Sequence, residues 1–519
     1  MRLHDYVDFL GREHPDWEFA VCGDRQLSYG EALAESNRLA NALAGAGLAR
    51  GDRFSYLSKN SLEYPLLFIA ASKIGAVPVP LNYRLAPLEL AYIANDSGSR
   101  ILIARGEYVD AIDGIRSELK TVETFIGLEA PAHAGWESYA SWVGAQPATA
   151  PECEVQPDDD LYQMYTSGTT GRPKGAIVTH RALLSQLSQQ IPAFEVTSDD
   201  RTLIVAPLYH AAAAVTAMGC IVLGSPMVIH EEFDPTAVVR ALSEERITRT
   251  TLVPAMIQAC LVFVSDVAER SYDNLRLIVY GASPIAAEPL KRAMEVFGCD
   301  FAQGYGMTET TAQLTLLTPD DHRAALAGRP ELLLSAGRPI PGTQVRIVDE
   351  NDRPVPNGTI GEIVGRGPQL MRGYWNLPEA SAEALKGGWM HTGDAGILDD
   401  EGYLYIQDRT KDMVVSGGEN VYPREVENVL FEHPAVADVA VIGVPDEKWG
   451  EAVKAIIVLR EGESATSEEI IDFCRGKLAG YKRPRSVDFI DALPRNASGK
   501  VLKKDLREKY WVGHTRRVS

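Results

Sequence analysis

Through the first four hundred residues, apolar runs that suit β-strands alternate with apolar patterns that suit helices. A strand-like run at residues 53–58 is followed by a helix-like pattern at 62–74. Strands that alternate with helices in this way are typical of parallel sheets covered by helices. We therefore predict an α/β fold whose large N-terminal domain consists of layered sheets and helices.

The pattern changes toward the C-terminus. Between residues 345 and 406 the apolar runs are short and are separated by Gly, Pro and Asn, which is typical of a small antiparallel, β-barrel-like subdomain. After residue 412 the alternation restarts, with a helix from about residue 424, strands near 436–443 and 453–459, and a helix from 467. About a hundred residues suit a separate α+β domain. We predict an N-terminal domain at 1–408 and a small C-terminal domain at 412–519.

One apolar run, residues 209–229, is long enough to cross a bilayer. His210, two glycines and Ser225-Pro226 interrupt it, which favours a buried helix that turns into a strand over an integral membrane segment. The rest of the chain is compatible with a folded protein of at least two domains, because 519 residues exceed the size of one compact core.

The net charge excludes some classes of binding partner, and the cysteines indicate the cellular compartment. The formal net charge of −20, with no basic block, argues against nucleic acid and anionic membranes as partners. The six cysteines lie far apart and show no zinc-site spacing, which favours reduced thiols in the cytoplasm. Residues 1–15 carry charges throughout and lack the apolar core of a secretory signal. The oligomeric state stays open, with a homodimer among the options.

The strongest chemical signal is the segment 165–175, which reads Tyr-Thr-Ser-Gly-Thr-Thr-Gly-Arg-Pro-Lys-Gly. Hydroxyls and glycines supply donors that can surround a polyphosphate, and Lys174 adds a positive charge. The Walker pattern does not fit, because Pro173 follows Gly168 by five residues. A simple turn between strands is the alternative for so short a motif. The candidate phosphate-binding residues are Thr166, Ser167, Gly168, Thr169, Thr170 and Lys174.

This segment resembles the phosphate-binding signature of the adenylate-forming superfamily, which includes acyl-CoA synthetases, non-ribosomal adenylation domains and firefly luciferases. Further segments that resemble its signatures follow in order at 281–284, 303–310, 391–394 and 494–500. The resemblance implies that a carboxylic acid reacts with ATP and Mg²⁺ to form an acyl-adenylate. Transfer of the acyl group to coenzyme A, the co-substrate, then gives a thioester.

The segment 303–310 carries a carboxylate, Glu309, and a flat ring, Tyr305. A carboxylate beside phosphates is unfavourable unless it binds a cation, so we expect Glu309 to bind Mg²⁺. Gly304 and Gly306 would let the substrate approach the backbone, and Tyr305 could stack on a base. By resemblance, Thr308 contacts the α-phosphate and Tyr305 the adenine. The same resemblance places Gly281, Ala282 and Ser283 on the other side of the adenine. Taken singly, each loop could be an ordinary turn at a strand end.

Three further residues are assigned mainly by the resemblance. Asp394 follows His-Thr-Gly at a strand end, where it could bind both ribose hydroxyls or merely cap a turn. Arg409 would assist from the hinge side, unless it is a surface ion-pair partner. Lys500, on a Gly/Ser loop, would offset the negative charge of the carboxylate and the α-phosphate during adenylation.

The resemblance also implies that the C-terminal domain is mobile. It would rotate about a hinge at residues 409–411, centred on Lys411, and bring Gly417 and Gly418 to a pantetheine tunnel. Trp449 would then meet the CoA chain, although packing within its own domain is the alternative.

His210 resembles a residue at the mouth of the acyl pocket, where it would be a gate beside the carboxylate; a satisfied core histidine is the alternative. Ala211–Ala214 leave room beyond it, and with Ala312 and Gln313 they admit a long apolar chain or a flat aromatic acid. We favour a medium- or long-chain fatty acid because these segments carry little charge, and an aryl or cinnamic-type acid stays open.

Two rival functions deserve comparison with an acyl-CoA synthetase. An amino-acid adenylation domain would need an Asp at the start of the pocket helix, and residues 209–214 have no carboxylate. A non-catalytic nucleotide-binding relative need not keep both a metal carboxylate, Glu309, and a mobile lysine, Lys500.

Overall fold

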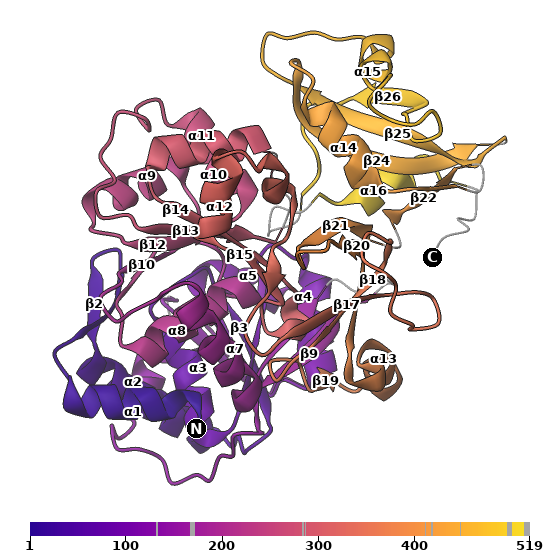
Figure 1. Cartoon of the computed structure of the whole chain (residues 1–519). Coiled ribbons are helices and arrows are strands. Elements are labelled where there is room, and N and C mark those ends of the chain that lie inside the picture. The colour runs from indigo at the N-terminus through magenta and orange to yellow at the C-terminus, as the bar shows by residue number, and fades with distance from the viewer. Residues whose placement is uncertain are drawn as a thin grey trace.

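The computed structural model describes residues 1–130, 133–166, 172–282, 285, 287–409, 412–416, 419–446, 448–495 and 501–512, and the backbone alone of residues 408 and 409. Figure 1 shows the elements from β22 to α16 as a smaller orange and yellow lobe beside a larger lobe. The predicted division into a large layered part and a small α+β part is confirmed at this level. The limits at residues 408 and 412 stay predictions.

The largest sheet of the described chain is mixed, with the strand order β16-β15-β14-β13-β12-β10-β11-β1-β2. Its central strands are parallel, and β2, β15 and β16 add antiparallel edges. The strands are β1 (Glu18–Cys22), β2 (Arg25–Ser28), β10 (Thr202–Ile204), β11 (Met227–Ile229), β12 (Arg249–Leu252), β13 (Leu277–Gly281), β14 (Asp300–Tyr305), β15 (Thr315–Leu317) and β16 (Arg338–Pro339).

A second, parallel sheet has the order β4-β3-β5-β6-β7, and a short antiparallel one has the order β19-β9-β8. Their strands are β3 (Arg53–Leu57), β4 (Val77–Pro80), β5 (Ile101–Arg105), β6 (Thr124–Leu128), β7 (Glu137–Ser138), β8 (Asp160–Thr166), β9 (Lys174–Thr179) and β19 (Gly373–Tyr374). The helices of the N-terminal part are α1 (Leu3–Glu13), α2 (Tyr29–Gly45), α3 (Glu63–Ile74), α4 (Pro87–Ser97), α5 (Val109–Asp113), α6 (Tyr139–Gly144), α7 (His180–Ala193), α8 (Ala211–Leu223), α9 (Pro235–Glu244), α10 (Pro254–Phe263), α11 (Ala287–Phe297), α12 (Pro319–Leu326) and α13 (Pro378–Ala384).

The barrel-like subdomain is an antiparallel sheet of order β17-β18-β20-β21, in the region where the short apolar runs predicted it. The C-terminal lobe has the strand order β23-β22-β25-β24, and β26 pairs with β25. The elements of both parts are β17 (Gln344–Val348), β18 (Gly361–Arg366), β20 (Met390–Leu398), β21 (Leu404–Arg409), β22 (Val414–Ser416), β23 (Glu419–Val421), α14 (Pro423–Phe431), β24 (Val436–Asp446), β25 (Gly450–Leu459), α15 (Ser467–Phe473), β26 (Ser486–Phe489) and α16 (Lys503–Glu508).

The predicted strand at 53–58 is β3 and the predicted helix at 62–74 is α3. Every residue of α3 is buried, as expected for a helix that is apolar on all sides. The apolar run at 209–229 folds as the buried helix α8, which ends at Gly224 with φ 74°, followed by β11. Among the described residues, no helix is both long enough and apolar enough to cross a membrane.

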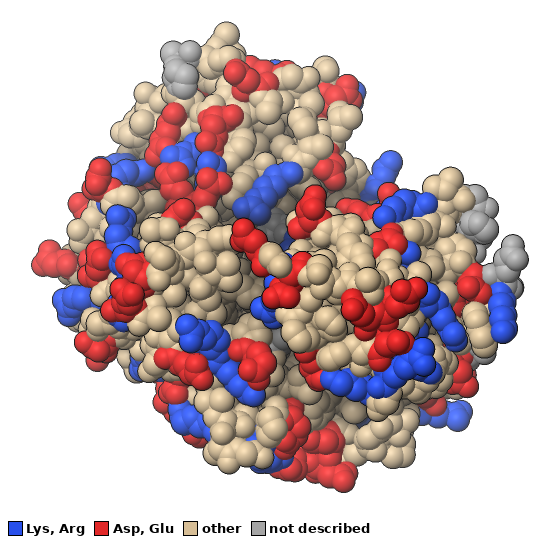
Figure 2. Space-filling view, turned by 90° about the horizontal axis from the view of Figure 1, so that it is seen from above, with Lys and Arg blue, Asp and Glu red and all other residues tan. Residues whose placement is uncertain are grey.

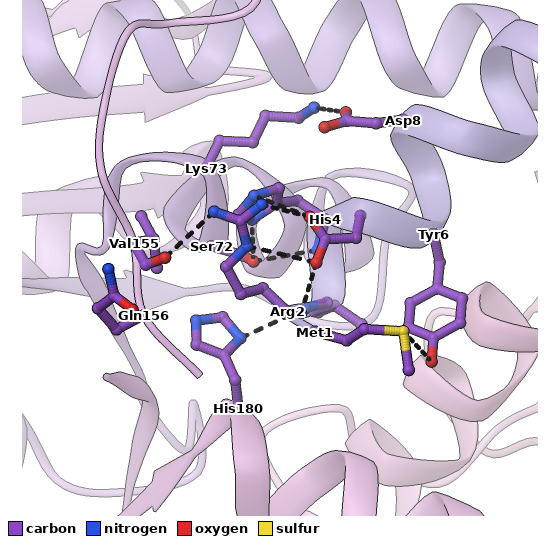
Figure 3. Close-up of polar contacts among 12 residues, drawn as sticks. Met1, Arg2, His4, Tyr6, Asp8, Ser72, Lys73, Val155, Gln156 and His180 are labelled. Carbon is purple, nitrogen blue, oxygen red and sulfur yellow. Dashed lines mark hydrogen bonds and ion pairs between the residues drawn. The ribbon is translucent and has the colours of Figure 1, made fainter. Parts of the chain in front are cut away.

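The N-terminal residues bind to two buried helices (Figure 3). The Leu3 amide donates to Nδ1 of His180 over 3.3 Å, and His4 bonds to Ser72 over 2.7 Å. The buried ammonium group of Lys73 pairs with Asp8. Burial lowers the pKa of His180 to about 3, so this histidine is neutral in the folded protein at ordinary pH. These contacts attach α1 to α3 and α7.

Figure 2 shows acidic and basic side chains interspersed over the face of the molecule that it views. No large surface of one sign is visible there, although the chain carries a net charge of −20. Any phosphate group must therefore bind at a local cluster of donors and cations.

Candidate active site

The predicted adenine-binding loops meet where two parallel strands end. Strands β13 and β14 lie in register, with Gly281 opposite Gly304. A Cβ atom on Gly281 would lie 2.4 Å from the Gly304 carbonyl oxygen. Ala282 follows with φ 65°, a left-handed conformation that turns the chain out of the sheet. Loops that follow the carboxyl ends of parallel strands are the usual ligand sites of α/β folds.

The glycines of the segment 303–310 have a different role from the one expected. A Cβ atom on Gly306 would lie 2.1 Å from the Ala312 carbonyl oxygen, and one on Gly304 would lie 2.3 Å from the Gln313 side-chain amide. The space beside each glycine is therefore filled by the protein itself. These glycines allow the loop to fold back on the strand that carries it; the approach of a substrate to their backbone stays a prediction.

A cluster of polar groups surrounds Glu309, which lies in the short 3-10 turn Thr308–Thr310 and is 4% exposed. Its Oε1 accepts a hydrogen bond from the Tyr374 hydroxyl over 2.9 Å and from the Thr166 hydroxyl over 3.3 Å. The Lys174 ammonium group lies 5.0 Å from the centre of the Tyr374 ring. Thr166 ends β8 and Lys174 begins β9, and the two residues pair in the ladder. The predicted phosphate-binding segment thus begins at Glu309 and ends beside Tyr374, which bonds to Glu309.

The sequence reasoning missed Tyr374. Its strand β19 pairs with β9, which places the phenol over the Glu309 carboxylate. Burial, and then the Glu309 charge, raise the pKa of Tyr374 far above its usual value, so the hydroxyl keeps its proton and donates. The only available signal was the segment Gly373-Tyr374-Trp375, and nothing in it indicates a partner 65 residues away.

The residues around Glu309 suit a magnesium ion. In the described part of the chain, no residue bonds to its second carboxylate oxygen, Oε2. No group of three or more His, Cys, Asp and Glu residues is placed to hold a metal among the described residues. Magnesium commonly binds through one or two carboxylates, with substrate phosphates and water completing its shell. One buried carboxylate beside a predicted phosphate-binding segment fits that mode.

Tyr305 and Asp394 meet although they lie in different sheets. The Tyr305 hydroxyl donates to Oδ2 of Asp394 over 2.9 Å, and the Asp394 amide donates to Thr392 over 3.1 Å. The backbone of Arg409 lies opposite Asp394 in the β20–β21 ladder. A flat ring and a carboxylate in direct contact can bind a base and its ribose side by side.

His210 caps the N-terminus of α8 and is half-buried. Burial lowers its pKa, so its imidazole is neutral at neutral pH. The first turns of α8 are lined by small buried residues, and Ala312 packs against the same core cluster. The helix predicted to line an acyl pocket therefore lies next to the loop that carries Glu309.

In the C-terminal lobe, Trp449 is half-buried between two cations. The Lys448 ammonium group lies 4.8 Å from the centre of its ring and the Arg485 guanidinium 5.1 Å. Arg475, Arg483 and Arg485 line a nearby cavity of about 250 Å³. The sequence reasoning missed these arginines, because basic residues scattered through a lobe give no signal until folding gathers them. A cavity lined by guanidinium groups suits phosphate groups.

Comparison with protein families decides the assignment. Residues 10–375 match the family model described as AMP-binding enzyme, and residues 425–500 match the AMP-binding enzyme C-terminal domain. The chain belongs to the family of AMP-binding enzymes. The predicted membership of the adenylate-forming acyl-CoA synthetases is thereby confirmed.

Relatives of this AMP-binding enzyme act on acids of different kinds. It is 37% identical to a fatty acid–[acyl-carrier-protein] ligase, ScoC, of Streptomyces coeruleorubidus, over 99% of this chain and 97% of the relative. It is 40% identical to a feruloyl-CoA synthase of an Amycolatopsis species, over 94% and 95%.

Among solved structures, a fatty acyl CoA synthetase of Mycobacterium tuberculosis has a TM-score of 0.79 at 37% identity, covering 99% of both chains. ATP-bound MatB of Rhodopseudomonas palustris has a TM-score of 0.90 at 30% identity, covering 99% of this chain and 100% of that one.

The structure of this AMP-binding enzyme brings several predicted residues together. Thr166 bonds to Glu309, and Lys174 lies beside Tyr374, which also bonds to Glu309. Tyr305 contacts Asp394, and the Gly281 strand lies beside that of Tyr305. Other predictions fall outside the described residues: Ser167, Gly168, Thr169, Thr170, Ser283, Lys411, Gly417, Gly418, Lys500 and the side chain of Arg409.

Proposed function

We propose that the protein is an AMP-forming acyl-CoA ligase that uses ATP and coenzyme A to convert a carboxylic acid into its thioester. The observation that carries this proposal is the contact of Glu309 with Thr166 and Tyr374, beside Lys174. A triphosphate with its metal requires hydrogen-bond donors, a cation and a carboxylate in one place. The contact brings together the two ends of the hydroxyl-rich segment, the cation of Lys174 and the buried carboxylate of Glu309.

In the first half-reaction the carboxylate of the acid attacks the α-phosphate of ATP, and pyrophosphate leaves. Lys174 and the donors of residues 166–170 hold the phosphates, and Thr308 contacts the α-phosphate. Tyr305 binds the adenine, and Asp394 binds the ribose. Magnesium, held at Glu309, would neutralise charge on the departing pyrophosphate. Lys500 offsets the charge that develops between the two anions as they approach.

In the second half-reaction the thiol of coenzyme A attacks the adenylate and AMP leaves. The C-terminal lobe would turn about residue 411, so that Lys500 withdraws and Gly417, Gly418 and Trp449 reach the pantetheine chain. The arginine cavity near Trp449 supports this assignment, because coenzyme A carries phosphates that need cations on a protein of net charge −20.

For the acid, we propose a medium- or long-chain fatty acid, and an aryl or cinnamic-type acid is the second candidate. The small buried residues at the start of α8 support an apolar pocket beyond His210. We place the enzyme in the cytoplasm, since all six cysteines are free thiols.

The proposal is tested by ATP–pyrophosphate exchange with a panel of straight-chain and aromatic acids, followed by CoA-dependent release of AMP. Exchange and AMP release with at least one acid are expected. Exchange without a CoA effect would indicate another acceptor, such as a carrier protein, and no exchange with any acid would favour a nucleotide-binding protein without this activity.

The role of Lys500 is tested with Lys500→Ala, which should lower exchange by about a hundredfold or more. The same variant should still transfer an acyl group from added acyl-adenylate to coenzyme A. Lys504→Ala is a matched control, because the Lys504 side chain is 77% exposed and lies four residues away. Equal loss in both half-reactions would contradict the assignment of Lys500 to adenylation.

A further inference from the structure

A buried guanidinium lies beside helices α7 and α8. Arg249 begins β12 and is 4% exposed. It lines a cavity of about 10 Å³ together with Gln190 of α7 and Thr216 and Gly219 of α8. That volume is just large enough for one water-sized group. The remaining wall is apolar, from residues such as Leu187 and Val215.

Arg249 is unpaired within the described chain: its side chain forms no ion pair or hydrogen bond there, and its Nε is buried without a partner. Oε1 of Gln190, in the same cavity, is also buried without a partner. A buried charge without a partner is strongly unfavourable, and arginine keeps its proton under physiological conditions. The guanidinium on this wall of the cavity therefore lacks an acceptor until a ligand supplies one.

The carboxylate whose field reaches Arg249 is already engaged. Asp200 accepts hydrogen bonds from Arg276 over 2.9 Å and from Thr248 over 2.7 Å. Arg249 and Arg276 thus share the field of one carboxylate, which leaves one positive charge without a counter-charge. The Arg276 side chain is 40% exposed, whereas Arg249 is 4% exposed. The uncompensated charge lies on the cavity wall.

The cavity lies along the helix that is predicted to line the acid-binding pocket. Helix α8 starts beside His210, and Thr216 and Gly219 lie six and nine residues further on, about 9 and 14 Å along the axis. Thr251 follows Arg249 by two residues, on the same face of β12, and its hydroxyl lies 3.5 Å from that of Thr216. Helix α8 therefore extends from the predicted acid gate to the cavity that Arg249 lines.

We propose that the acid activated by this enzyme carries an acceptor oxygen at the end remote from the reacting carboxylate, and that Arg249 binds this oxygen. The inference rests on the proposed function and narrows its substrate class. A second carboxylate of a medium-chain acid and the hydroxyl of a phenolic acid share the required chemistry. The sequence predicted a pocket with little charge, and Arg249 was not considered. Arg249 lies on β12, outside the segments from which the pocket was predicted.

The test compares kcat/KM in CoA-dependent AMP release for matched pairs of acids. Sebacic acid is compared with decanoic acid, and para-hydroxycinnamic acid with cinnamic acid. The oxygenated member should be preferred by at least about tenfold in one of the pairs, because a site built to bond an oxygen rejects the analogue that lacks it. The pair that shows the preference identifies which kind of oxygen Arg249 binds.

Arg249→Met should remove that preference, so that the two acids of the pair are used with equal kcat/KM. Arg240→Met is the control, because Arg240 is exposed on α9 and does not line this cavity, so the preference should stay in place. Equal or better use of the unsubstituted acid in both pairs by the wild-type enzyme would overturn the inference, even if Arg249→Met fails to fold. That outcome differs from failure of the proposed function, in which no acid supports exchange.

Discussion

The contact between Tyr374 and Glu309 can be tested by removing a single oxygen. Tyr374→Phe keeps the ring beneath Lys174 and deletes the hydroxyl that donates to Glu309 over 2.9 Å. A hydrogen bond to a charged acceptor contributes about 1.5–3 kcal/mol, which corresponds to about tenfold to a hundredfold in affinity. The remaining donor, Thr166, lies at 3.3 Å, and the carboxylate is 4% exposed, so water cannot replace the lost bond easily. We expect the variant to need about tenfold more Mg²⁺, the usual scale when a group that orients a metal ligand is lost.

The assay is ATP–pyrophosphate exchange as a function of Mg²⁺ concentration at saturating acid. Tyr272→Phe is the control, because it also removes a buried hydroxyl bond, to the Val267 carbonyl over 2.8 Å, in a different core cluster. Its exchange rate and Mg²⁺ dependence should match the wild type. If Tyr374→Phe shows an unchanged Mg²⁺ dependence, or if both variants lose exchange equally, Tyr374 does not position the metal ligand.

Four other predictions address the loop, the thiol site, the hinge and the pH response. Gly306→Ala places a Cβ atom 2.1 Å from a backbone oxygen and should abolish exchange, whereas Gly144→Ala, with nothing within 4 Å, should not. Arg483→Ala should raise KM for coenzyme A with exchange unchanged; a shift in exchange alone would argue against a CoA site at the arginine cavity. Lys411→Pro should spare exchange and slow thioester formation, and equal loss of both would argue against the hinge. His180, with a folded pKa of about 3, takes up its proton in the unfolded chain first, so its stabilising effect is present above pH 6.5 and declines as pH falls. The loss of unfolding free energy between pH 7 and pH 5, measured with urea, should be about 2 kcal/mol smaller in His180→Asn than in the wild type.

Much of the fold followed from local patterns. The alternation of strand and helix signals predicted the layered part, since each signal is carried by a continuous stretch such as residues 53–74. The position of Lys174 beside Thr166 follows from a hairpin whose ends pair directly. Such features depend on neighbours in the sequence, so the sequence alone can specify them.

The features that were missed depend on which segments meet in space. Tyr374 reaches Glu309 only because β19 adds to the edge of β9, and Arg249 reaches the pocket only because β12 runs beneath α8. The packing role of Gly306 was missed for the same reason: its neighbour, the Ala312 backbone, is brought there by a fold-back of the chain. A residue whose partner lies on another element carries no local sign of that partner.

The residues proposed to bind phosphate and the residues proposed to recognise the acid occupy different parts of the molecule. This separation has a functional consequence. Of the groups proposed to handle phosphate, Thr166 and Lys174 lie at strand ends, and Glu309 lies on a tight turn near Gly306, which tolerates no added atom. The wall proposed to recognise the acid consists of side chains on α7, α8 and β12, which can change without moving the backbone. Relatives named for fatty and for feruloyl substrates, at 37% and 40% identity, are what such a division predicts. The chemistry can then stay constant while substitutions at positions such as Arg249 select the acid.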